Sequence, residues 1–306
     1  MISTLGALQP WLDDPDVEEV MVVAGSSVFT DGADGMRPVG NLAESDVAHI
    51  IELVSRAAGR RIDLLSPVLD ARFADGSRVC VVVPPVSMDG PTVSVRKFSS
   101  RVPPLASFGP PACTEALRTL VESRANVVVS GATSSGKTTL VAAAAARFDA
   151  SERIVCAEDT SEIRFVNHHV VRLQTRPASP DGSGEVTLRD LVRASLRLRP
   201  DRLVVGEVRG GEVIDMLLAL SSGHRGCWST VHASSAAGAL ERLSTLLLRD
   251  QPQWTPGAAE RLIAASVDAI VHMVRDAHGR RRIDSIARVD VSDAHLSLVP
   301  VFSRGR

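Results

Sequence analysis

Residues 126–148 read NVVVSGATSSGKTTLVAAAAARF, which is an apolar strand, a glycine-bounded loop and an alanine-rich helix in immediate succession. The loop Gly131–Thr138, GATSSGKT, matches the pattern GxxxxGK[ST]. Gly131 and Gly136 let the backbone curl so that its N–H groups converge on phosphate oxygens. The helix that begins near Lys137 adds the positive end of its dipole. The stretch therefore predicts a phosphate-binding loop between a strand and a helix.

The chemistry of this loop predicts a nucleotide and a divalent cation as ligands. Lys137 would neutralise the β- and γ-phosphates, and the Thr138 hydroxyl would ligate Mg²⁺. ATP and Mg²⁺ are thus the expected ligands. The residues expected to contact the nucleotide are Gly131, Ala132, Thr133, Ser134, Ser135, Gly136, Lys137, Thr138 and Thr139.

Strands and helices alternate around this loop. Continuous apolar strands such as NVVVS, RIVCA and RLVVG are typical of a parallel sheet that is covered on both faces. The expected strands are 126–130, 153–157, 202–206 and 228–232, with shorter ones near 269–274, 283–289 and 296–302. The expected helices are 114–124, 137–148, 188–199 and 212–221. The pattern predicts the α/β class, with ligands at the carboxyl edge of the sheet.

A proline-rich break at 99–112, SSRVPPLASFGPPA, separates this region from a smaller one. Proline fixes φ and restrains the preceding residue, so the break is typical of an extended linker. Upstream, apolar residues have helical spacing over 46–59, and strands are expected at 68–73, 78–83 and 92–98. We therefore expect a small N-terminal α+β domain at 1–98, a linker at 99–112 and a nucleotide-binding domain at 113–306.

The composition argues against several classes of protein. The formal net charge is −2 and only 3% of residues are aromatic, with no Tyr, so no nucleic-acid partner is expected. No basic start with an apolar run indicates a signal peptide, and no apolar stretch is long enough to span a membrane, so we expect a cytoplasmic protein. The cysteines are far apart in the chain and are expected to be small, buried or partly buried side chains: Cys80, Cys113, Cys156 and Cys227.

Two expected strands end in carboxylates that could serve a phosphate-binding loop. Glu207 follows the strand at 202–206, and Glu158 with Asp159 follows the strand at 153–157. The carboxyl ends of parallel strands meet at one edge of the sheet, so these acids should lie near the nucleotide. Glu207 can act on the metal or polarise the attacking water. The sequence leaves open whether Glu158 or Glu207 activates that water.

Two histidines flank the next strand, at 228–232. His232 at its end is interpreted as a sensor of the γ-phosphate. A structural and a functional role are equally compatible with His224, which precedes the strand.

Four motifs in order carry a resemblance to a known family: GATSSGKTTL, AEDTSEIR, RPDRLVVGEVRGGEVIDMLLALSSGHRG and STVHASS. They resemble those of VirB11/CpaF-type secretion ATPases, and most of all those of tight-adherence (Tad/Flp) pilus assembly ATPases. The similarity runs over nearly the whole chain and includes the N-terminal stretch DPDVEEVMV. It implies a RecA-like P-loop ATPase domain behind the N-terminal domain, and subunits that form a homo-hexameric ring. It also implies hydrolysis of ATP to drive pilus assembly or protein secretion through an inner-membrane platform protein, with the motor peripherally associated with the cytoplasmic membrane.

The resemblance also assigns residues. Glu158 with Asp159 would be the Asp box, Glu207 the Walker B acid and 223–232 the His box. Arginines of the N-terminal domain reach the phosphates in this family, so the expected clamp is Arg72, Arg78 and Arg96. Two departures are the absence of the tetracysteine motif of the GspE/PilB-like branch and Ser234 in place of the usual Asn.

Other arginines keep alternative interpretations. Arg209 could brace Glu207 or Glu212 structurally. Arg189, Arg193 and Arg197 are spaced by four and would form a basic stripe that faces a ring pore, an acidic neighbour or solvent.

The resemblance leaves three rival functions: a nucleic-acid-translocating RecA-like motor, a conjugative type IV secretion ATPase and a non-catalytic nucleotide-binding scaffold.

Overall fold

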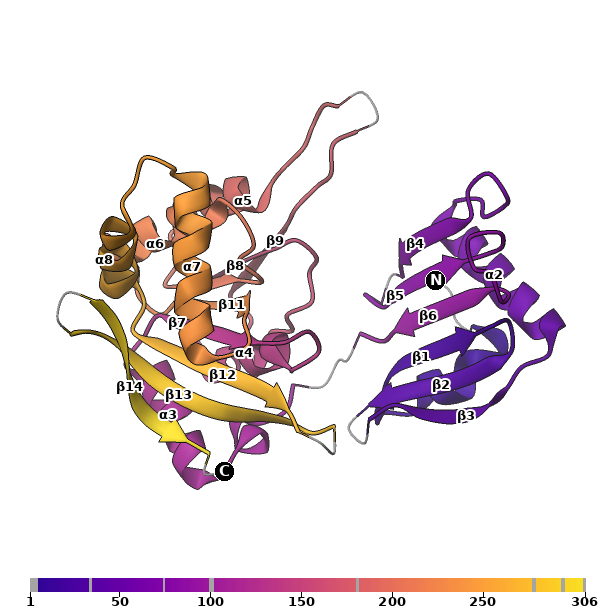
Figure 1. The fold of residues 1–306 in the computed structure, drawn as a ribbon, viewed down its shortest axis with the longest axis horizontal. Helices are drawn as coiled ribbons and strands as arrows, with labels where there is room; N and C mark the ends of the chain where they lie inside the picture. The colour runs from indigo at the N-terminus through magenta and orange to yellow at the C-terminus, as the bar shows by residue number, and fades with distance from the viewer. Residues whose placement is uncertain are drawn as a thin grey trace. The chain divides into compact units, whose positions relative to one another are not determined.

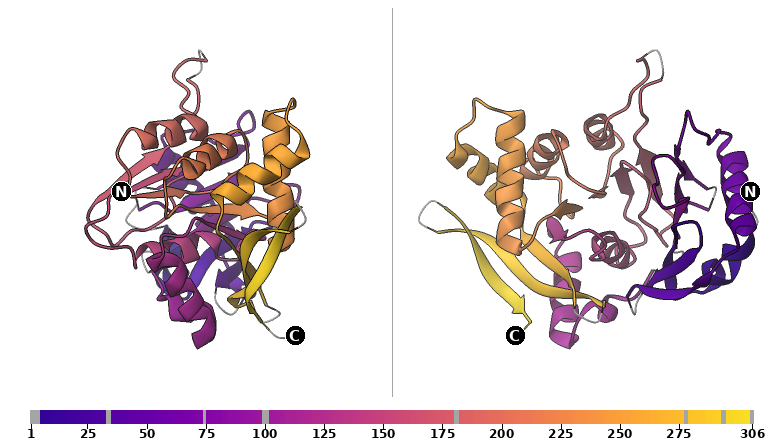
Figure 2. Two further views of the ribbon diagram at one scale, coloured as in Figure 1. Left: turned by 90° about the vertical axis from the view of Figure 1, so that its left-hand side faces the viewer. Right: turned by 45° about the vertical axis from the view of Figure 1, so that its right-hand side comes forward.

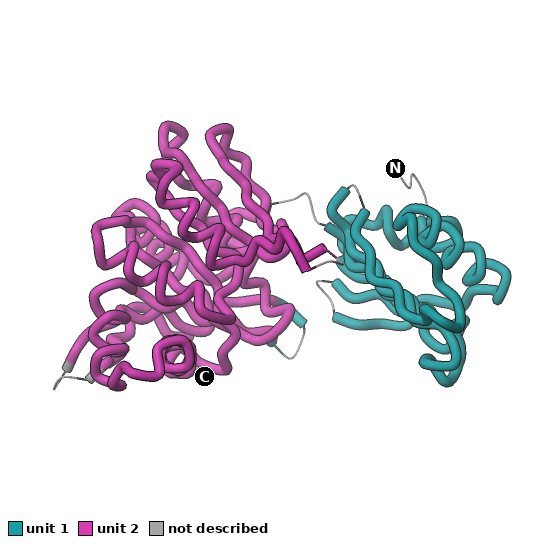
Figure 3. Tube along the Cα trace, turned by 90° about the horizontal axis from the view of Figure 1, so that it is seen from above, with its two compact units in different colours: residues 1–100, 276–280 teal, residues 101–275, 281–306 magenta. Residues whose placement is uncertain are grey.

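The computed structural model describes residues 5–32, 35–73, 75–98, 102–179, 182–276, 279–292 and 295–304. The chain divides into two compact units (Figure 3). Unit 1 comprises residues 1–100 and 276–280, and unit 2 comprises 101–275 and 281–306. The expected linker at 99–112 begins at residues that lie outside the described ranges. Its later part forms a short 3₁₀ helix, η2 (Leu105–Phe108), and the start of a helix.

Unit 1 is an antiparallel sheet of six strands with a helix packed on it (Figure 1). The sheet has the order β3-β2-β1-β6-β5-β4. Val47, Ile50 and Val54 of the helix join the alternating valines of the strands in one core, which is why the helical spacing at 46–59 predicted it. In chain order the elements are η1 (Gly6–Leu8), α1 (Gln9–Asp13), β1 (Val17–Val23), β2 (Ser27–Gly32), β3 (Arg37–Asn41), α2 (Glu44–Ala58), β4 (Val68–Arg72), β5 (Arg78–Val82) and β6 (Thr92–Arg96).

Unit 2 is an α/β unit around a sheet of eight strands with the order β14-β13-β12-β7-β11-β10-β8-β9. The strands from β12 to β9 in this order are parallel, and β13 and β14 are antiparallel additions. The strands are β7 (Val127–Gly131), β8 (Ile154–Glu158), β9 (Val170–Gln174), β10 (Arg202–Val205), β11 (Trp228–His232), β12 (Ala269–Arg275), β13 (Arg281–Ser292) and β14 (His295–Ser303). The helices are α3 (Pro111–Glu122), α4 (Lys137–Ala145), α5 (Leu188–Leu196), α6 (Glu212–Ser221), α7 (Ala236–Asp250) and α8 (Pro256–Ser266).

Helices cover both faces of this sheet, as the views of Figure 2 show. One core joins α3, α4 and η2 to residues such as Val127 and Val129 of β7. The other joins α5 to α8 to the opposite face, through residues such as Val128 and Ile270. Strands buried on both faces favour apolar side chains at successive positions, and β7, β8 and β10 have them except at their ends, where Ser130, Glu158 and Arg202 are buried.

The α/β class expected from the sequence is confirmed, but the expected element set is incomplete. The strands β1, β2, β3 and β9 and the helices α1, α7 and α8 were not predicted. Three cysteines are buried, as expected, whereas Cys80 is exposed, so the expectation for that residue was wrong. Its neighbours on β5 alternate between the core and the solvent, and Cys80 falls on the solvent side. Among the described helices, none is both long enough and apolar enough to cross a bilayer.

Candidate active site

The phosphate-binding loop follows β7 at the carboxyl edge of the sheet, between β12 and β11. Its backbone enters the left-handed region at Gly136 (φ +93°) and at Ser134 (φ +59°). A Cβ atom on Gly131 would lie 2.5 Å from the carbonyl oxygen of Met273, so only glycine fits where β7 passes β12. The loop thus has the curled backbone that a phosphate cradle needs.

Lys137, at the start of α4, is buried in this loop, with 6% of its surface exposed. Its ammonium donates to the carbonyl oxygens of Gly131 (3.1 Å) and Ala132 (2.9 Å) and to Nδ1 of His232 (3.2 Å). An ammonium can only donate, so Nδ1 of His232 accepts and the ring proton sits on Nε2. The lysine is therefore held at the loop by acceptors that a phosphate could replace.

Glu207 lies on the other side of the same histidine. Its Oε1 is 2.8 Å from Nε2 of His232, a close polar contact that lacks the geometry of a hydrogen bond. Lys137, His232 and Glu207 thus form a continuous polar chain from the phosphate loop to the acid after β10. The sequence predicted all three residues, and the structure places them together.

The segment after β10 that carries Glu207 is held at several points. Arg209 donates from its guanidinium to Oε2 of Glu207 (2.8 Å). Its main-chain N–H donates to the carboxylate of Glu212 at the start of α6 (2.5 Å). Thr230 of β11 donates to the carbonyl oxygen of Gly206 (2.6 Å). The bracing role considered for Arg209 is what the structure shows, and it leaves Glu207 facing His232.

The acids after β8 are in a different environment. Glu158 is buried, and its Oε1 accepts the main-chain N–H groups of Glu162 and Ile163, both at 2.9 Å. Burial raises the pKa of its carboxyl, and the two main-chain N–H groups act in the opposite direction. Partial burial also raises the pKa of Asp159, opposed by the charge of Arg209. Glu158 therefore shapes the loop after its strand, whereas Asp159 lies within electrostatic range of the Glu207 segment.

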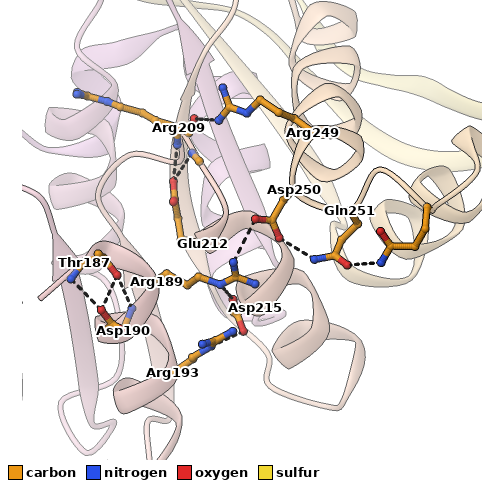
Figure 4. A network of polar contacts seen from close by, with 12 residues as sticks. Thr187, Arg189, Asp190, Arg193, Arg209, Glu212, Asp215, Arg249, Asp250 and Gln251 are labelled. Atoms are coloured by element: carbon orange, nitrogen blue, oxygen red, sulfur yellow. Dashed lines mark hydrogen bonds and ion pairs between the residues drawn. The ribbon is translucent and has the colours of Figure 1, made fainter.

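Figure 4 shows a polar network that extends from Arg209, in the segment after β10, to the helices α5, α6 and α7. Arg189 and Arg193 of α5 both bind Asp215 of α6, at 2.6 and 2.7 Å. Arg189 also reaches Asp250 at the end of α7 (3.1 Å). The expected stripe is thus wrong for Arg189, which is held between two carboxylates and is 31% exposed, whereas Arg193 pairs with Asp215 and still faces solvent, as one of the alternatives allowed. Arg197 follows the last residue of α5 and is exposed.

The three arginines expected from the N-terminal domain lie in unit 1, at one end of its sheet. Arg72 of β4 is paired with Arg78 of β5, and Arg78 is paired in turn with Arg96 of β6. The strand register therefore aligns three arginines from three neighbouring strands, and Glu19 of β1 is the next residue in the row, opposite Arg96.

Two residues that contact the loop or the residue before it were not predicted. Arg281 of β13 donates from Nε to the carbonyl oxygen of Ser134 (3.0 Å). Its Cδ would lie 2.9 Å from a Cβ on Gly136. His272 of β12 lies 2.9 Å from the hydroxyl of Ser130. Only the order of the strands brings β12 and β13 beside the loop, so no local sequence signal announces these contacts. His224 bonds the carbonyl oxygen of Ala219 at the end of α6 (3.2 Å) and belongs to a helix terminus.

The loop residues fit a phosphate group. The hydroxyl of Ser135 is buried, and no hydrogen-bond partner for it is found among the described residues. Donors that stay buried without a partner are rare, and phosphate oxygens would satisfy this one. No cluster of three or more His, Cys, Asp or Glu side chains in the described ranges could hold a metal ion. Mg²⁺ in nucleotide sites takes few ligands from the protein and several from phosphates and water. The Thr138 hydroxyl and the Glu207 carboxylate are oxygen ligands of the type that such a site uses.

Comparison with known proteins is consistent with this geometry. A family model described as type II/IV secretion system protein matches residues 4–297. A protein of Mycobacterium tuberculosis is 36% identical in an alignment of 327 residues that covers 100% of this chain and 90% of that protein. The type IV secretion system protein PtlH of Bordetella pertussis is 33% identical over 317 residues, covering 92% of this chain and 93% of PtlH. A solved structure of the VirB11 ATPase from the Brucella suis type IV secretion system, in complex with sulphate, has a TM-score of 0.51 and 29% identity over 92% of each chain.

Proposed function

The chain belongs to the type II/IV secretion system protein family, and on that premise we propose that it is a motor ATPase that hydrolyses ATP to power secretion or pilus assembly. One observation carries the proposal: the chain of contacts from Lys137 through His232 to Glu207. It joins a phosphate grip to a carboxylate through the side chain of one histidine. A scaffold that only binds nucleotide has no need for this connection.

The residues divide the reaction between them. The γ-phosphate would compete with the acceptors that now hold Lys137, and His232 would transmit that change to Glu207. Glu207 is the better candidate to activate water, because Glu158 already uses its carboxylate to hold the main chain of its own loop. Mg²⁺ bound at the Thr138 hydroxyl, with Glu207 acting through water, would supply charge neutralisation at the phosphates. The loop residues 131–139 would make the direct contacts with the nucleotide.

The wider assembly is part of the same proposal. The row Arg72, Arg78 and Arg96 would bind phosphate oxygens by charge-assisted, bidentate hydrogen bonds. The segment 99–112 would act as the hinge between an N-terminal domain at 1–98 and an ATPase domain at 113–306. Subunits would form a homo-hexamer at the cytoplasmic face of the inner membrane and act on a platform protein there. A tight-adherence pilus is the specific assignment that the sequence motifs favour.

A second candidate is a type IV secretion motor, because PtlH, at 33% identity over 92% of this chain, is a type IV secretion system protein. The same catalytic chemistry serves both candidates. Copurification from the native host separates them: a pilus platform protein supports the first, and type IV secretion components support the second.

The test of ATPase function is phosphate release by the purified chain with ATP and Mg²⁺, at a protein concentration high enough for rings to form. Hydrolysis that stops with EDTA and in Lys137→Ala is the expected result. If the wild-type chain binds ATP, forms rings and releases no phosphate, it is a scaffold and the proposal is wrong. Tight, salt-sensitive binding of single-stranded DNA that stimulates hydrolysis would instead support a nucleic-acid motor.

A further inference from the structure

Glu212, the first residue of α6, carries a buried carboxylate that the proposed mechanism does not use. Only 7% of its surface is exposed, although it lies at the start of a helix. Its Oε1 accepts the main-chain N–H groups of Arg209 (2.5 Å) and Gly210 (2.7 Å). A carboxylate at this depth is costly unless it is hydrogen-bonded, and both of these donors belong to the segment that follows Glu207.

A second helix also holds the main chain of Arg209 (Figure 4). Arg249, near the end of α7, donates from Nη2 to the carbonyl oxygen of Arg209 (3.0 Å). The N–H of Arg209 is therefore bonded to α6 and its carbonyl oxygen to α7. Two bonds from two helices fix the position of this main chain more closely than either bond would alone.

The side chain of Arg209 transmits this restraint to the candidate catalytic acid. Its Nη2 donates to Oε2 of Glu207 at 2.8 Å. The Arg209 side chain is 62% exposed, and an exposed ion pair between two flexible side chains is weak by itself. The direction from which the guanidinium approaches Glu207 therefore depends on where the Arg209 main chain is held.

Two glycines before α6 allow the close packing that these bonds require. A Cβ on Gly210 would lie 3.0 Å from Oε2 of Glu212, and a Cβ on Gly211 would lie 2.5 Å from Oδ1 of Asp250. Asp250 is bound in turn by Arg189 of α5 at 3.1 Å. The turn into α6 is thus packed against polar groups of α5, α6 and α7.

A role in capping the helix is the simpler account of Glu212, and α5 offers the comparison. Asp190 of α5 accepts the main-chain N–H of Thr187 (3.0 Å) and is exposed (Figure 4). That bond joins two residues of one helix terminus. Glu212 instead holds the main chain of Arg209, whose side chain binds Glu207.

We propose that Glu212, together with Arg249, is a positioning residue for ATP hydrolysis, which orients Glu207 by fixing the main chain of Arg209. The proposal rests on the function proposed above and deepens it. Loss of the bonds to Arg209 should slow the chemical step more than it weakens nucleotide binding, because the phosphate loop keeps its own donors.

The first test compares steady-state hydrolysis by the wild type, E212A, E212Q and D190A. E212A removes the acceptor of both N–H groups, and kcat should fall about 10- to 100-fold while KM for ATP changes less than about twofold. E212Q keeps an oxygen at the position of Oε1 and should recover most of kcat. D190A removes the capping carboxylate of α5 and is the matched control, with kcat expected at the wild-type value.

The second test repeats E212A in an R209A background. If Glu212 acts through the Arg209 side chain, E212A should change kcat less than about twofold once that side chain is removed. A capping role alone would give the same loss in both backgrounds. If E212A does not fold, R249A replaces it in both backgrounds, because Arg249 is exposed and removes only the bond to the carbonyl oxygen.

A wild-type kcat in the single variant would overturn the proposal, and so would a loss that E212Q does not reduce or that is equally large in the R209A background. Hydrogen exchange of the nucleotide-free protein gives a readout apart from activity. The amides of residues 208–211 should exchange faster in E212A than in the wild type and D190A. Unchanged exchange would overturn the proposal even in a chain that hydrolyses ATP, whereas faster exchange in a chain without hydrolysis would defeat only the proposed function.

Discussion

Replacing Glu152 by Ala should destabilise unit 2 strongly and leave its chemistry intact. Glu152 precedes β8, and its carboxylate binds Arg202, the first residue of β10, with Nε and Oε2 2.7 Å apart. Both side chains are only 4% exposed. The Arg202 guanidinium lies 4.5 Å from the centre of the Phe148 ring and donates to the carbonyl oxygen of Val121. Without Glu152 the buried guanidinium of Arg202 would lose its ion pair, and so would Arg124, whose Nη2 lies 2.5 Å from Oε1 of Glu152.

The expected cost follows from that burial. Removing one partner of a buried ion pair costs about 3–5 kcal/mol. In a unit of roughly 200 residues, each kcal/mol lowers the midpoint by about 2–4 °C, so the loss should be about 6–20 °C. The pair lies at the amino ends of the parallel strands, away from the phosphate loop. The rate of phosphate release per folded molecule should therefore be unchanged at a temperature where the variant is folded.

Scanning calorimetry measures the thermal midpoint, and a phosphate-release assay measures the activity. The double variant Glu152→Leu with Arg202→Met replaces both charges by apolar side chains and should recover most of the midpoint. Glu115→Ala is the control, because Glu115 forms an exposed pair with Arg118 on α3 and should leave the midpoint unchanged. Equal midpoints for Glu152→Ala and Glu115→Ala would refute the reasoning, as would a double variant less stable than Glu152→Ala.

Two further changes test the loop after β8 and the phosphate loop. Glu158→Gln should raise the thermal midpoint at neutral pH, since Gln still accepts the two main-chain N–H groups but buries no charge. In the wild type, the pKa of the Glu158 carboxyl is raised in the folded state above its ordinary value of 4.5, so the protein is fully stabilised below pH 4.5 and loses stability as the pH rises through the folded pKa. The difference in thermal midpoint between the two proteins should therefore vanish below about pH 4.5. A difference that does not depend on pH would contradict this. Gly136→Ala should abolish binding of a fluorescent ATP analogue by titration, because φ is +93° and the new Cβ would lie 2.9 Å from Cδ of Arg281. Gly35→Ala of unit 1, where φ is +89° and a Cβ would meet no atom of the described residues within 4 Å, is the control and should bind normally. Unchanged binding by Gly136→Ala would show that the loop is not the site.

Local patterns were enough to predict the phosphate loop and most of the sheet around it. β7, β8 and β10 are continuous apolar runs because they are buried on both faces, and such runs are visible in a single sequence. The strands β1 to β3 were missed where a mixed, partly exposed pattern gives a weaker signal. The helix α7 was also not predicted, although Leu240, Leu243 and Leu247, which it buries, have helical spacing in the sequence.

Contacts that depend on strand order could not be predicted in the same way. A lone histidine in an apolar strand such as β12 has no local mark of function, and His272 reaches Ser130 only because β12 lies beside β7. Asp215 defines what Arg189 and Arg193 do, but it lies on the next helix, 26 residues from Arg189. The pairing of β5 with β4 and β6 likewise determines the alignment of Arg72, Arg78 and Arg96 in one row.

The most direct test of the central claim is single-turnover hydrolysis by Glu207→Gln with a preformed complex of enzyme, ATP and Mg²⁺. The chain from Lys137 through His232 to Glu207 predicts that this variant still binds ATP, while the hydrolysis step slows by about 10²–10⁴-fold. Glu241→Gln, at an exposed position of α7, should hydrolyse at the wild-type rate. If Glu207→Gln turns over bound ATP as fast as Glu241→Gln, Glu207 does not act on the attacking water and the account of the site is wrong.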